Sequence, residues 1–185
     1  SFRSLHNKTY FFKQQKLVSN MSLKLNLGCG EDIREEFINL DIKKHKGVDI
    51  VHDLNKKLPF KTNSVNYIYC SHVLEHLENP TKFIQELYRI SKNGTEIYLR
   101  VPHFSMFGTY ADLTHIRPGF SYFIFGTPHW NKDFYKRFEV KAFLNFTGVN
   151  YTFLNKIFNP IINISPMIYE RFFCYLLPCS EIHSN

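Results

Sequence analysis

The 185-residue sequence lacks any C-x-x-C pair, although it contains four cysteines. Cys174 and Cys179 stand five positions apart without a cluster of histidines beside them. A zinc site is therefore not expected, and no metal is predicted. A disulfide framework is also not expected in a chain of this size with a regular core. We interpret the cysteines as reduced, which predicts a cytoplasmic protein.

The sequence also lacks a long apolar run. No stretch reaches the roughly 18 consecutive apolar residues that a membrane span requires, and the N-terminus shows no signal-peptide pattern. The apolar segment 153–179 is interrupted by three prolines. We expect it to pack against the core, with a role at a membrane surface as the alternative. Residues 1–20 precede Met21 and are interpreted as an N-terminal extension, either a lid over a site or a cloning remnant.

What the chain does contain is an ordinary globular composition, with 44% hydrophobic and 21% charged residues. Its length predicts one domain, residues 21–185, with an insert at about 103–136. The formal net charge of +7 favours anionic partners. The basic clusters are short and dispersed, so we interpret them as solvated loops rather than as a groove that follows phosphates. The 19 Phe and 11 Tyr suit flat or cationic ligands.

Short apolar runs that alternate with helices or long connections predict an α/β protein with a mostly parallel sheet covered on both faces. Residues 31–37 leave room for a turn or two of helix at most. A further strand is expected at 137–146 and a helix around 167–177. The other strands are predicted at 23–27, 38–42, within 47–54 ending near His52 or Asp53, at 65–70 and at 95–102.

The segment "NPTKFIQELYRISKNG" (79–94) predicts the clearest helix. Asn79 can cap its first turn and Pro80 suits the first helical position. Asn93-Gly94 is expected to form the C-terminal turn. One apolar stripe consists of Phe83, Ile84, Leu87 and Ile90.

The most informative stretch is "LNLGCGEDIREEFINLDI" (25–42), which places a Gly-x-Gly turn directly after an apolar strand. Glycine allows positive φ and a close approach of the backbone to a ligand. A dinucleotide fingerprint needs a third glycine and a helix that faces a pyrophosphate. Here Glu31 and Asp32 follow Gly30 instead, which disfavours NAD and FAD. A cofactor with a ribose, an adenine and a cationic centre but no phosphate fits better.

Two acids at strand ends support this interpretation. Asp41 lies at the end of the second strand, where its carboxylate can accept hydrogen bonds from both ribose hydroxyls. Asp53 lies at the end of the third strand, near the place of an adenine edge. In open parallel sheets ligands bind at the carboxyl ends of the strands. The alternative is that both acids are turn formers.

At this point the sequence resembles the class I S-adenosylmethionine-dependent methyltransferases of the methyltransferase type 11 group. The resemblance is ordered from Leu25 to about Ser121, and "ERFFCYLLPCSEIH" (170–183) resembles the tail of some members. The matching pieces are "LNLGCG" (25–30), "INLDI" (38–42), "DIVHDLNKKLPF" (49–60), "VNYIYCSHVLEHL" (65–77) and "PTKFIQELYRISKNGTEIYLRVP" (80–102).

The resemblance implies a Rossmann-like α/β sandwich, whose seven-stranded sheet is mostly parallel with an antiparallel last strand. It implies S-adenosyl-L-methionine as cofactor and S-adenosyl-L-homocysteine as its product. Gly28, Cys29 and Gly30 would wrap the methionine part. Asn26 stands where the family often has an acid, and would accept from the methionine amine more weakly. The shortened first helix would leave one side of the cofactor open.

The resemblance also assigns the rest of the cofactor site. Asp41, followed by Ile42, would hold the ribose. Asp53 and Leu54 would lie against the adenine.

Ser71 and His72, just past the fourth strand, would line the floor near the transferred methyl. His72 and His76 in "SHVLEHL" are interpreted as scaffold or floor rather than as a base. The chain ends at "SEIHSN", so the last edge strand is short and its pairing is an open question.

Methyl transfer from a sulfonium is an in-line displacement, accelerated mainly by alignment. A base is needed only where the acceptor must lose a proton, and histidine suits that role. His103, His115 and Arg117 fall in the long insert after the fifth strand and are the predicted catalytic residues. His115 would be the base or orient the acceptor, and Arg117 would clamp an anion. The alternative for each is a structural hydrogen bond within the insert.

The predicted function is methylation of a small-molecule, carbohydrate or lipid-linked acceptor, anionic acceptors included. The Asn/Asp-Pro-Pro-aromatic motif of amine methylation is missing after the fourth strand, where "CSHV" stands. Methylation of DNA amines or protein glutamine is therefore disfavoured. The charge leaves an RNA methyltransferase as one alternative. The short first helix and clipped end leave a non-catalytic cofactor-binding module as another. The sequence leaves the oligomeric state open.

Overall fold

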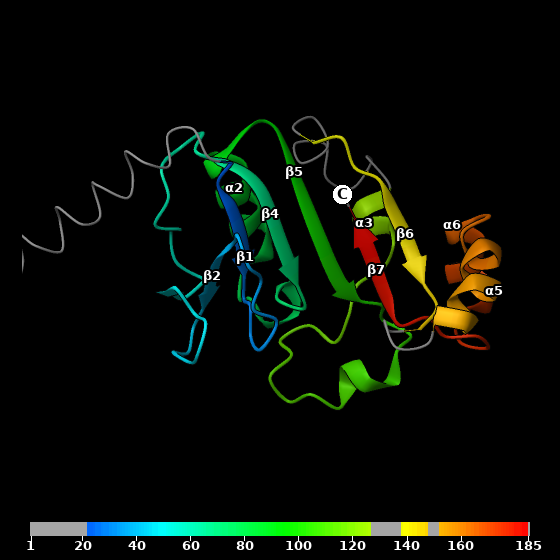
Figure 1. Cartoon of the computed structure of the whole chain (residues 1–185). Coiled ribbons are helices and arrows are strands. Elements are labelled where there is room, and N and C mark those ends of the chain that lie inside the picture. The colour runs from blue at the N-terminus through cyan, green and yellow to red at the C-terminus, as the bar shows by residue number, and fades with distance from the viewer. Residues whose placement is uncertain (1–21, 127–137, 148–151, 185) are drawn as a thin grey trace, which may run out of the picture.

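The computed structural model describes residues 22–126, 138–147 and 152–184. They form one seven-stranded sheet with the order β3-β2-β1-β4-β5-β7-β6 (Figure 1). The strands are β1 (Lys24–Leu27), β2 (Ile38–Asp41), β3 (Ile50–Val51), β4 (Val65–Ser71), β5 (Ser91–Pro102), β6 (Ala142–Asn145) and β7 (Glu181–Ser184).

Four neighbouring pairs in this sheet are parallel, from β3 to β5. Strand β7 is antiparallel to both of its neighbours, β5 and β6. The predicted α/β sheet with an antiparallel last strand is confirmed. The expectation that the last strand lies at an edge is wrong, because β7 inserts between β5 and β6 and leaves β6 as the edge. Its four residues are paired on both sides.

The predicted central helix is α2 (Pro80–Ile90). Its N-terminus is confirmed, since the Asn79 side chain accepts a hydrogen bond from the backbone N–H of Lys82 at 3.0 Å and Pro80 is the first residue. The predicted C-terminal turn at Asn93-Gly94 is wrong. The helix ends one turn earlier, and Ser91 already has extended backbone and begins β5. Asn93 and Gly94 lie in a register shift between β4 and β5.

The C-terminal segment is more helical than the sequence predicted. Helix α5 (Thr152–Ile162) was not expected, because Pro160 lies inside it. The helix predicted around 167–177 is a short α6 (Pro166–Ile168) that continues into η4 (Tyr169–Phe173), which has π-helical geometry. The strand expected at 137–146 is shorter than predicted, since β6 holds only four residues. Residues 1–20 fall outside the described part of the chain.

Three short helical turns complete the described elements. They are η2 (Leu74–His76) after β4, η3 (Phe107–Tyr110) after β5, and α3 (Phe123–Gly126). No described helix combines the length and the apolar character that crossing a bilayer requires.

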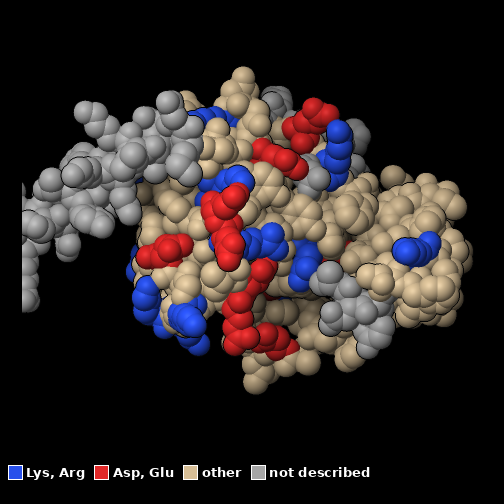
Figure 2. Space-filling model, in the orientation of Figure 1, with Lys and Arg blue, Asp and Glu red and all other residues tan. Residues whose placement is uncertain are grey.

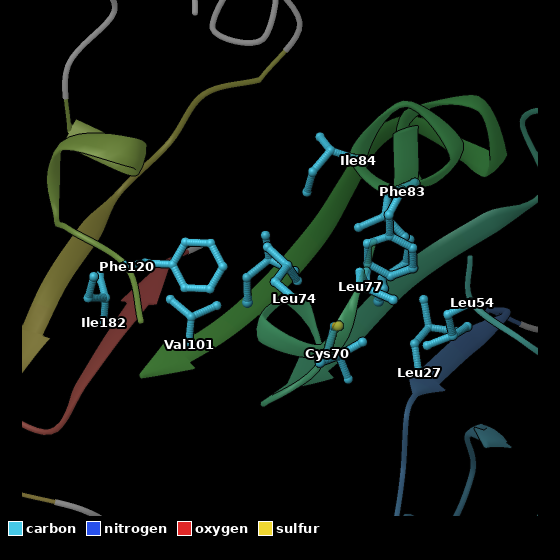
Figure 3. Packing of buried hydrophobic residues seen from close by; sticks show 14 of the residues in the cluster. Leu27, Leu54, Cys70, Leu74, Leu77, Phe83, Ile84, Val101, Phe120 and Ile182 are labelled. Carbon is cyan, nitrogen blue, oxygen red and sulfur yellow. The ribbon is translucent and has the colours of Figure 1, made fainter. Parts of the chain in front are cut away.

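One face of the sheet is covered by α2, which lies behind the strands in Figure 1. The helix brings its predicted apolar stripe onto aliphatic side chains of β1, β4 and β5, as Figure 3 shows. Fully buried members of this layer include Leu27, Ile68, Leu87, Ile90 and Val101. Their burial is the main apolar contribution to the stability of the fold.

The opposite face carries rings and charges instead. Tyr69 and Tyr98 stack with ring centroids 5.2 Å apart, and the Arg34 guanidinium lies 3.4 Å from the Tyr69 ring centroid. The Tyr98 hydroxyl and His183 Nδ1 are 2.5 Å apart. Phe37 meets Tyr67 edge to face. No described helix crosses β1, β4 and β5 on this side (Figure 1), so the expectation that helices cover both faces is not met among the described residues.

Candidate functional site

The carboxyl ends of β1, β2, β4 and β5 meet at one edge of the sheet, at the bottom of Figure 1. The loops after these strands carry most of the predicted site residues. The chain order reverses between β1 and β4, which is where ligands bind in open α/β sheets.

The glycine turn after β1 is built for close approach. Gly28 has φ +65°, and a Cβ there would lie 2.3 Å from Cγ2 of Val73. Gly30 has φ +48°, and nothing lies within 4 Å of the place of its Cβ. The first glycine is therefore needed for both conformation and space, whereas the second is needed for conformation alone and leaves its outer side open to a ligand.

Asp41 and Gly30 are joined directly. The backbone N–H of Gly30 donates to Asp41 Oδ2 at 2.8 Å, and that of Lys43 donates to Oδ1 at 2.9 Å. Each carboxylate oxygen keeps a lone pair for a further donor. Ile42 is 62% exposed and presents an apolar surface beside this carboxylate. A cavity of about 520 Å³ is lined by Gly30, Glu31, Ile33, Asp41, Lys43, His45 and Lys46.

Cys29 and Asn26 support this turn from inside. Burial, and after it the charge of Asp41, raises the pKa of the Cys29 thiol to about 11. Its backbone N–H donates to the carbonyl of Leu40 at 2.9 Å. Asn26 is buried, and its Nδ2 donates to the Asp32 carbonyl at 2.6 Å and to Asn39 Oδ1 at 2.9 Å. These contacts hold 31–37 as a series of turns with no helix.

Asp53 lies after β3 as predicted, but its carboxylate serves a turn. Its Oδ1 accepts from the backbone N–H of Asn55 at 3.0 Å, and Lys56 Nζ lies 3.5 Å from Oδ2. The Asn55 hydrogen bond lowers the pKa of Asp53, against a smaller effect of burial. Leu54 is buried beside Leu27 in the apolar layer (Figure 3).

Ser71 ends β4, and His72 follows with φ +54°, a conformation that is strained for a residue with a side chain. The turn aims the imidazole between two carboxylates: Nδ1 lies 3.1 Å from Glu75 Oε1 and Nε2 lies 3.1 Å from Glu181 Oε1. Burial alone would lower the pKa of His72, but the hydrogen bonds with Glu181 and Glu75 outweigh it and raise the pKa to about 9. His72 is therefore charged at neutral pH.

Glu181 is the other half of this pair and also accepts from His183, at 3.0 Å. Burial would raise its pKa, but hydrogen bonds from His183 and His72, and then the charge of Arg100, hold the pKa far below its usual range. A fixed carboxylate from β7 thus reaches the floor beside β4.

His103 is fully buried. Its Nε2 lies 3.0 Å from Glu170 Oε1 and its Nδ1 lies 2.8 Å from the Ser105 hydroxyl. Glu170 also accepts from the Ser121 hydroxyl at 2.6 Å and from the backbone N–H of Tyr122. In this arrangement His103 fastens the start of the insert to η4 and has no exposed surface.

His115 and Arg117 lie against η2. Nδ1 of His115 is 2.8 Å from the Thr109 carbonyl, and its ring meets that of His76 edge to face at 4.7 Å between centroids. The Arg117 guanidinium donates to the carbonyls of Leu77 at 2.7 Å and Glu78 at 3.3 Å. The structure therefore brings these two predicted residues together with the loop after β4, whereas the hydrogen-bond partners of the His103 ring are Ser105 and Glu170.

Sequence reasoning missed the acids that hold these histidines. Glu75, Glu170 and Glu181 are all buried, and each pairs with a histidine. The i,i+3 spacing of His72 and Glu75 in "SHVLE" could have indicated that these two side chains pair. The pairs with Glu170 and Glu181 span 67 and 109 residues and leave no local signal.

A larger cavity, of about 1200 Å³, lies at the opposite end of the sheet, between α2, residues 92–97 and residues 138–141. It contains none of the predicted site residues. On the face shown in Figure 2, carboxylates form a band down the middle, and Lys and Arg gather at the lower left. The net positive charge is therefore not gathered in one groove on this face.

Comparisons with known proteins agree with the geometry. Residues 21–99 match the family model described as "Methyltransferase domain", methyltransferase type 11. A solved S-adenosylmethionine-dependent methyltransferase from Archaeoglobus fulgidus is similar with a TM-score of 0.59 and 18% identity, covering 96% of this chain and 90% of that one. The class I methyltransferase fold is thereby confirmed.

Two other similarities are more distant or shorter. An uncharacterised protein of Methanocaldococcus jannaschii is 32% identical over 76 residues. This match spans 41% of the chain and only 36% of that protein. A Haemonchus contortus phosphoethanolamine N-methyltransferase 2, solved with S-adenosyl-L-methionine, has a TM-score of 0.49 and 11% identity over 92% of this chain and 50% of that one.

Proposed function

We propose that the protein uses S-adenosylmethionine to methylate a small-molecule or carbohydrate-type acceptor, because residues 21–99 match the methyltransferase type 11 family model. Lipid-linked and anionic acceptors belong to the same proposal. The predicted domain limits, 21–185 with an insert at 103–136, stay part of it. The cytoplasm remains the proposed location, in keeping with four cysteines that are all free and buried.

The observation that carries the proposal is the contact between Gly30 and Asp41. A backbone N–H of the glycine turn fixes the carboxylate after β2 at 2.8 Å, so the turn and the acid form one preorganised surface. Gly30, Ile33 and Asp41 line one cavity, and the exposed Ile42 follows Asp41 in the sequence. This surface fits a ligand that combines a ribose diol with an apolar ring.

When bound, S-adenosylmethionine would supply an electrophilic methyl on its sulfonium. The chain's own contribution is to bind and align. Gly28, Cys29 and Gly30, with Asn26 below them, would hold the methionine part, and Asp41 with Ile42 the ribose. Asp53 and Leu54 would border the adenine.

Ser71 and His72 would form the floor beside the methyl. Both ring nitrogens of His72 are held by Glu75 and Glu181, and the ring is charged at neutral pH, so it would add positive charge to the floor and not act as a base.

For the acceptor, we propose that His115 and Arg117 orient it from above the floor. The two carbonyl contacts of Arg117 fix the guanidinium plane, and its remaining N–H groups can bind an anionic group of the acceptor. His103 would act indirectly, by holding the insert through Glu170.

The first test is calorimetric titration with S-adenosylhomocysteine, comparing wild type with Asp41→Ala and Asp41→Asn. We expect micromolar-range binding to fall at least about tenfold in both variants, since each lost charge-assisted hydrogen bond contributes roughly 1.5–3 kcal/mol. Asp53→Ala is the matched control and should have the smaller effect, because its carboxylate already serves a turn. A folded wild type that does not bind at millimolar ligand would overturn the proposal.

A non-catalytic binding module is the second candidate. It is favoured by one observation, that His103 is fully buried against Glu170 and so not exposed to an acceptor. Transfer of a labelled methyl group to any component of a cell extract would exclude this candidate. Binding to RNA that weakens steeply with salt, together with labelled RNA, would identify the acceptor as RNA.

A further inference from the structure

Three side chains above the floor of the site have the geometry of a metal-binding cluster. One ligating atom each from Glu75, His76 and His115 lies within 4.8 Å of the others. Glu75 and His76 belong to η2. His115 belongs to the insert, 40 residues after Glu75 in the sequence, and its ring contacts the ring of His76. The backbone fixes this approach, because the N–H groups of Ile116 and Arg117 donate to the carbonyl of Glu75 at 2.9 and 3.1 Å.

Both histidines are placed so that Nδ1 can donate to the protein and Nε2 can bind a metal. Nδ1 of His76 lies 3.2 Å from the carbonyl of Thr114, and Nδ1 of His115 lies 2.8 Å from the carbonyl of Thr109. A carbonyl oxygen only accepts, so each Nδ1 carries the proton and each Nε2 presents a lone pair. A ligating histidine almost always donates its other N–H to a carbonyl or carboxylate in this way.

Glu75 supplies an independent observation. It has no exposed surface, yet its Oε2 has no hydrogen-bond partner among the described residues. Its other oxygen, Oε1, is held by His72 at 3.1 Å. A buried carboxylate oxygen without a partner is costly, and a bound cation at this position would remove that cost.

A second cluster, Cys29, Asp41 and His45, has similar spacing but weaker chemistry. Both oxygens of Asp41 already accept from backbone N–H groups. The Cys29 thiol has its pKa raised to about 11 and so remains protonated, whereas a metal binds the thiolate. The cluster of Glu75, His76 and His115 is therefore the better metal site.

We propose that Glu75 Oε2, His76 Nε2 and His115 Nε2 bind one divalent transition metal ion, of which Zn²⁺ is the best fit to two imidazoles and a carboxylate. Tetrahedral ligands at about 2.0–2.2 Å from the metal stand roughly 3.3–3.6 Å apart, so atoms that lie within 4.8 Å of one another would need to move only slightly closer to bind one ion. Asp112 lies at its rim, with Oδ2 3.7 Å from His115 Nε2. The fourth position is open to water or to an oxygen of a ligand.

The role of the metal rests on the proposed function. An acceptor hydroxyl at the fourth position would lose its proton to solvent more readily, since a bound cation lowers the pKa of the oxygen it contacts. The oxygen then forms the bond to the methyl carbon while the carbon–sulfur bond breaks and its electron pair stays on sulfur. His115 acts here as an orienter of the acceptor through the metal, which favours O-methylation.

Zinc binding is measured directly, on full-length protein first stripped with a chelator. Titration of Zn²⁺ against a chromophoric competitor and elemental analysis should give one ion per chain. His76→Ala, His115→Ala and Glu75→Gln should each weaken binding at least about tenfold, which is the usual effect of losing a ligand or its support. His45→Ala, from the second cluster, is the matched control and should bind as wild type does. Circular dichroism confirms that each variant is folded.

Wild-type affinity in both His76→Ala and His115→Ala would overturn the proposal, and so would loss of binding in His45→Ala alone. Calorimetry with S-adenosylhomocysteine on the metal-free protein separates this result from the proposed function. Cofactor binding without zinc binding refutes the metal site alone. Zinc binding without cofactor binding refutes the methyltransferase proposal and leaves the metal site standing.

Discussion

The face of the sheet that α2 covers is a continuous layer of aliphatic side chains, whereas the opposite face carries tyrosines, an arginine and paired acids and histidines. Leu27, Ile68 and Leu87 on the first face are fully buried. On the second face, Tyr98 stacks on Tyr69 and bonds to His183. The first face is held by non-directional burial and the second by directional contacts, so substitutions on the two faces should fail in different ways.

The largest loss is expected for Glu181→Ala on the polar face. Glu181 is buried and accepts from both His72 and His183, with Arg100 beside it. Removing one member of a buried ion pair leaves the other uncompensated, which typically costs about 3–5 kcal/mol. Denaturant unfolding measures this loss. Glu181→Gln keeps the shape and one acceptor and should lose less; an equal loss in both variants would mean that packing, not pairing, matters here.

On the aliphatic face, Leu87→Ala should lower the free energy of unfolding by about 2–5 kcal/mol, because it leaves a cavity under α2. Leu87 is fully buried and alanine suits a helix, so helix propensity does not confuse the result. The conservative Leu87→Met should cost under about 1.5 kcal/mol. If Leu87→Ala lowers the free energy of unfolding by less than about 1 kcal/mol, the aliphatic layer closes around the cavity, and burial holds this face less strongly than we expect.

In the glycine turn after β1, Gly28→Ala should lower the free energy of unfolding by roughly 1–3 kcal/mol because of the positive φ at this position. The clash of the new Cβ with Val73 should add to this loss. Gly30→Ala meets no atom within 4 Å and should cost less stability. Thermal unfolding compares the pair. Adding Val73→Ala to Gly28→Ala should recover part of the loss, and no recovery would show that backbone strain alone is responsible.

The smallest effect is expected for Tyr98→Phe, which removes one hydrogen bond to His183 and keeps the stack on Tyr69. The cost should be about 0.5–1.5 kcal/mol. Tyr98→Leu, which removes the stack as well, should cost about 0.5–1.5 kcal/mol more. If the two variants unfold at the same denaturant concentration, the ring stack does not stabilise this face.

Much of the aliphatic face could be predicted from the sequence. The apolar stripe of α2, its Asn79 cap and Pro80 are local signals, and all three are confirmed. The C-terminal end of α2 could not be read in the same way. Asn93-Gly94 has the composition of a helix end, but pairing of Ser91 with Val65 on β4 ends the helix first. Strand pairing overrides a local turn preference when it satisfies more backbone groups.

The same division holds at the candidate site. Gly28, Gly30 and Asp41 are close in sequence, and the pattern of strand, glycine turn, strand and acid placed them at one sheet edge. Glu170, which holds His103, and His76, which meets the His115 ring, come from distant elements and could not be predicted. The hydrogen bond between His115 and Thr109 lies within the insert, as the alternative for this residue predicted. Pro160 gave a wrong prediction: it indicated a break between helices, but it lies inside the continuous helix α5.

By itself the sequence determined the α/β class, the glycine turn with its strand-end acid, and the limits of α2 at its N-terminus, since each depends on residues within about one element of one another. The tertiary structure alone decided that β7 enters between β5 and β6, that Glu181 reaches His72 across 109 residues, and that His115 meets Glu75 and His76. These contacts form because the sheet brings loops that are far apart in the sequence side by side. The chemistry of the side chains alone does not specify which of these loops meet.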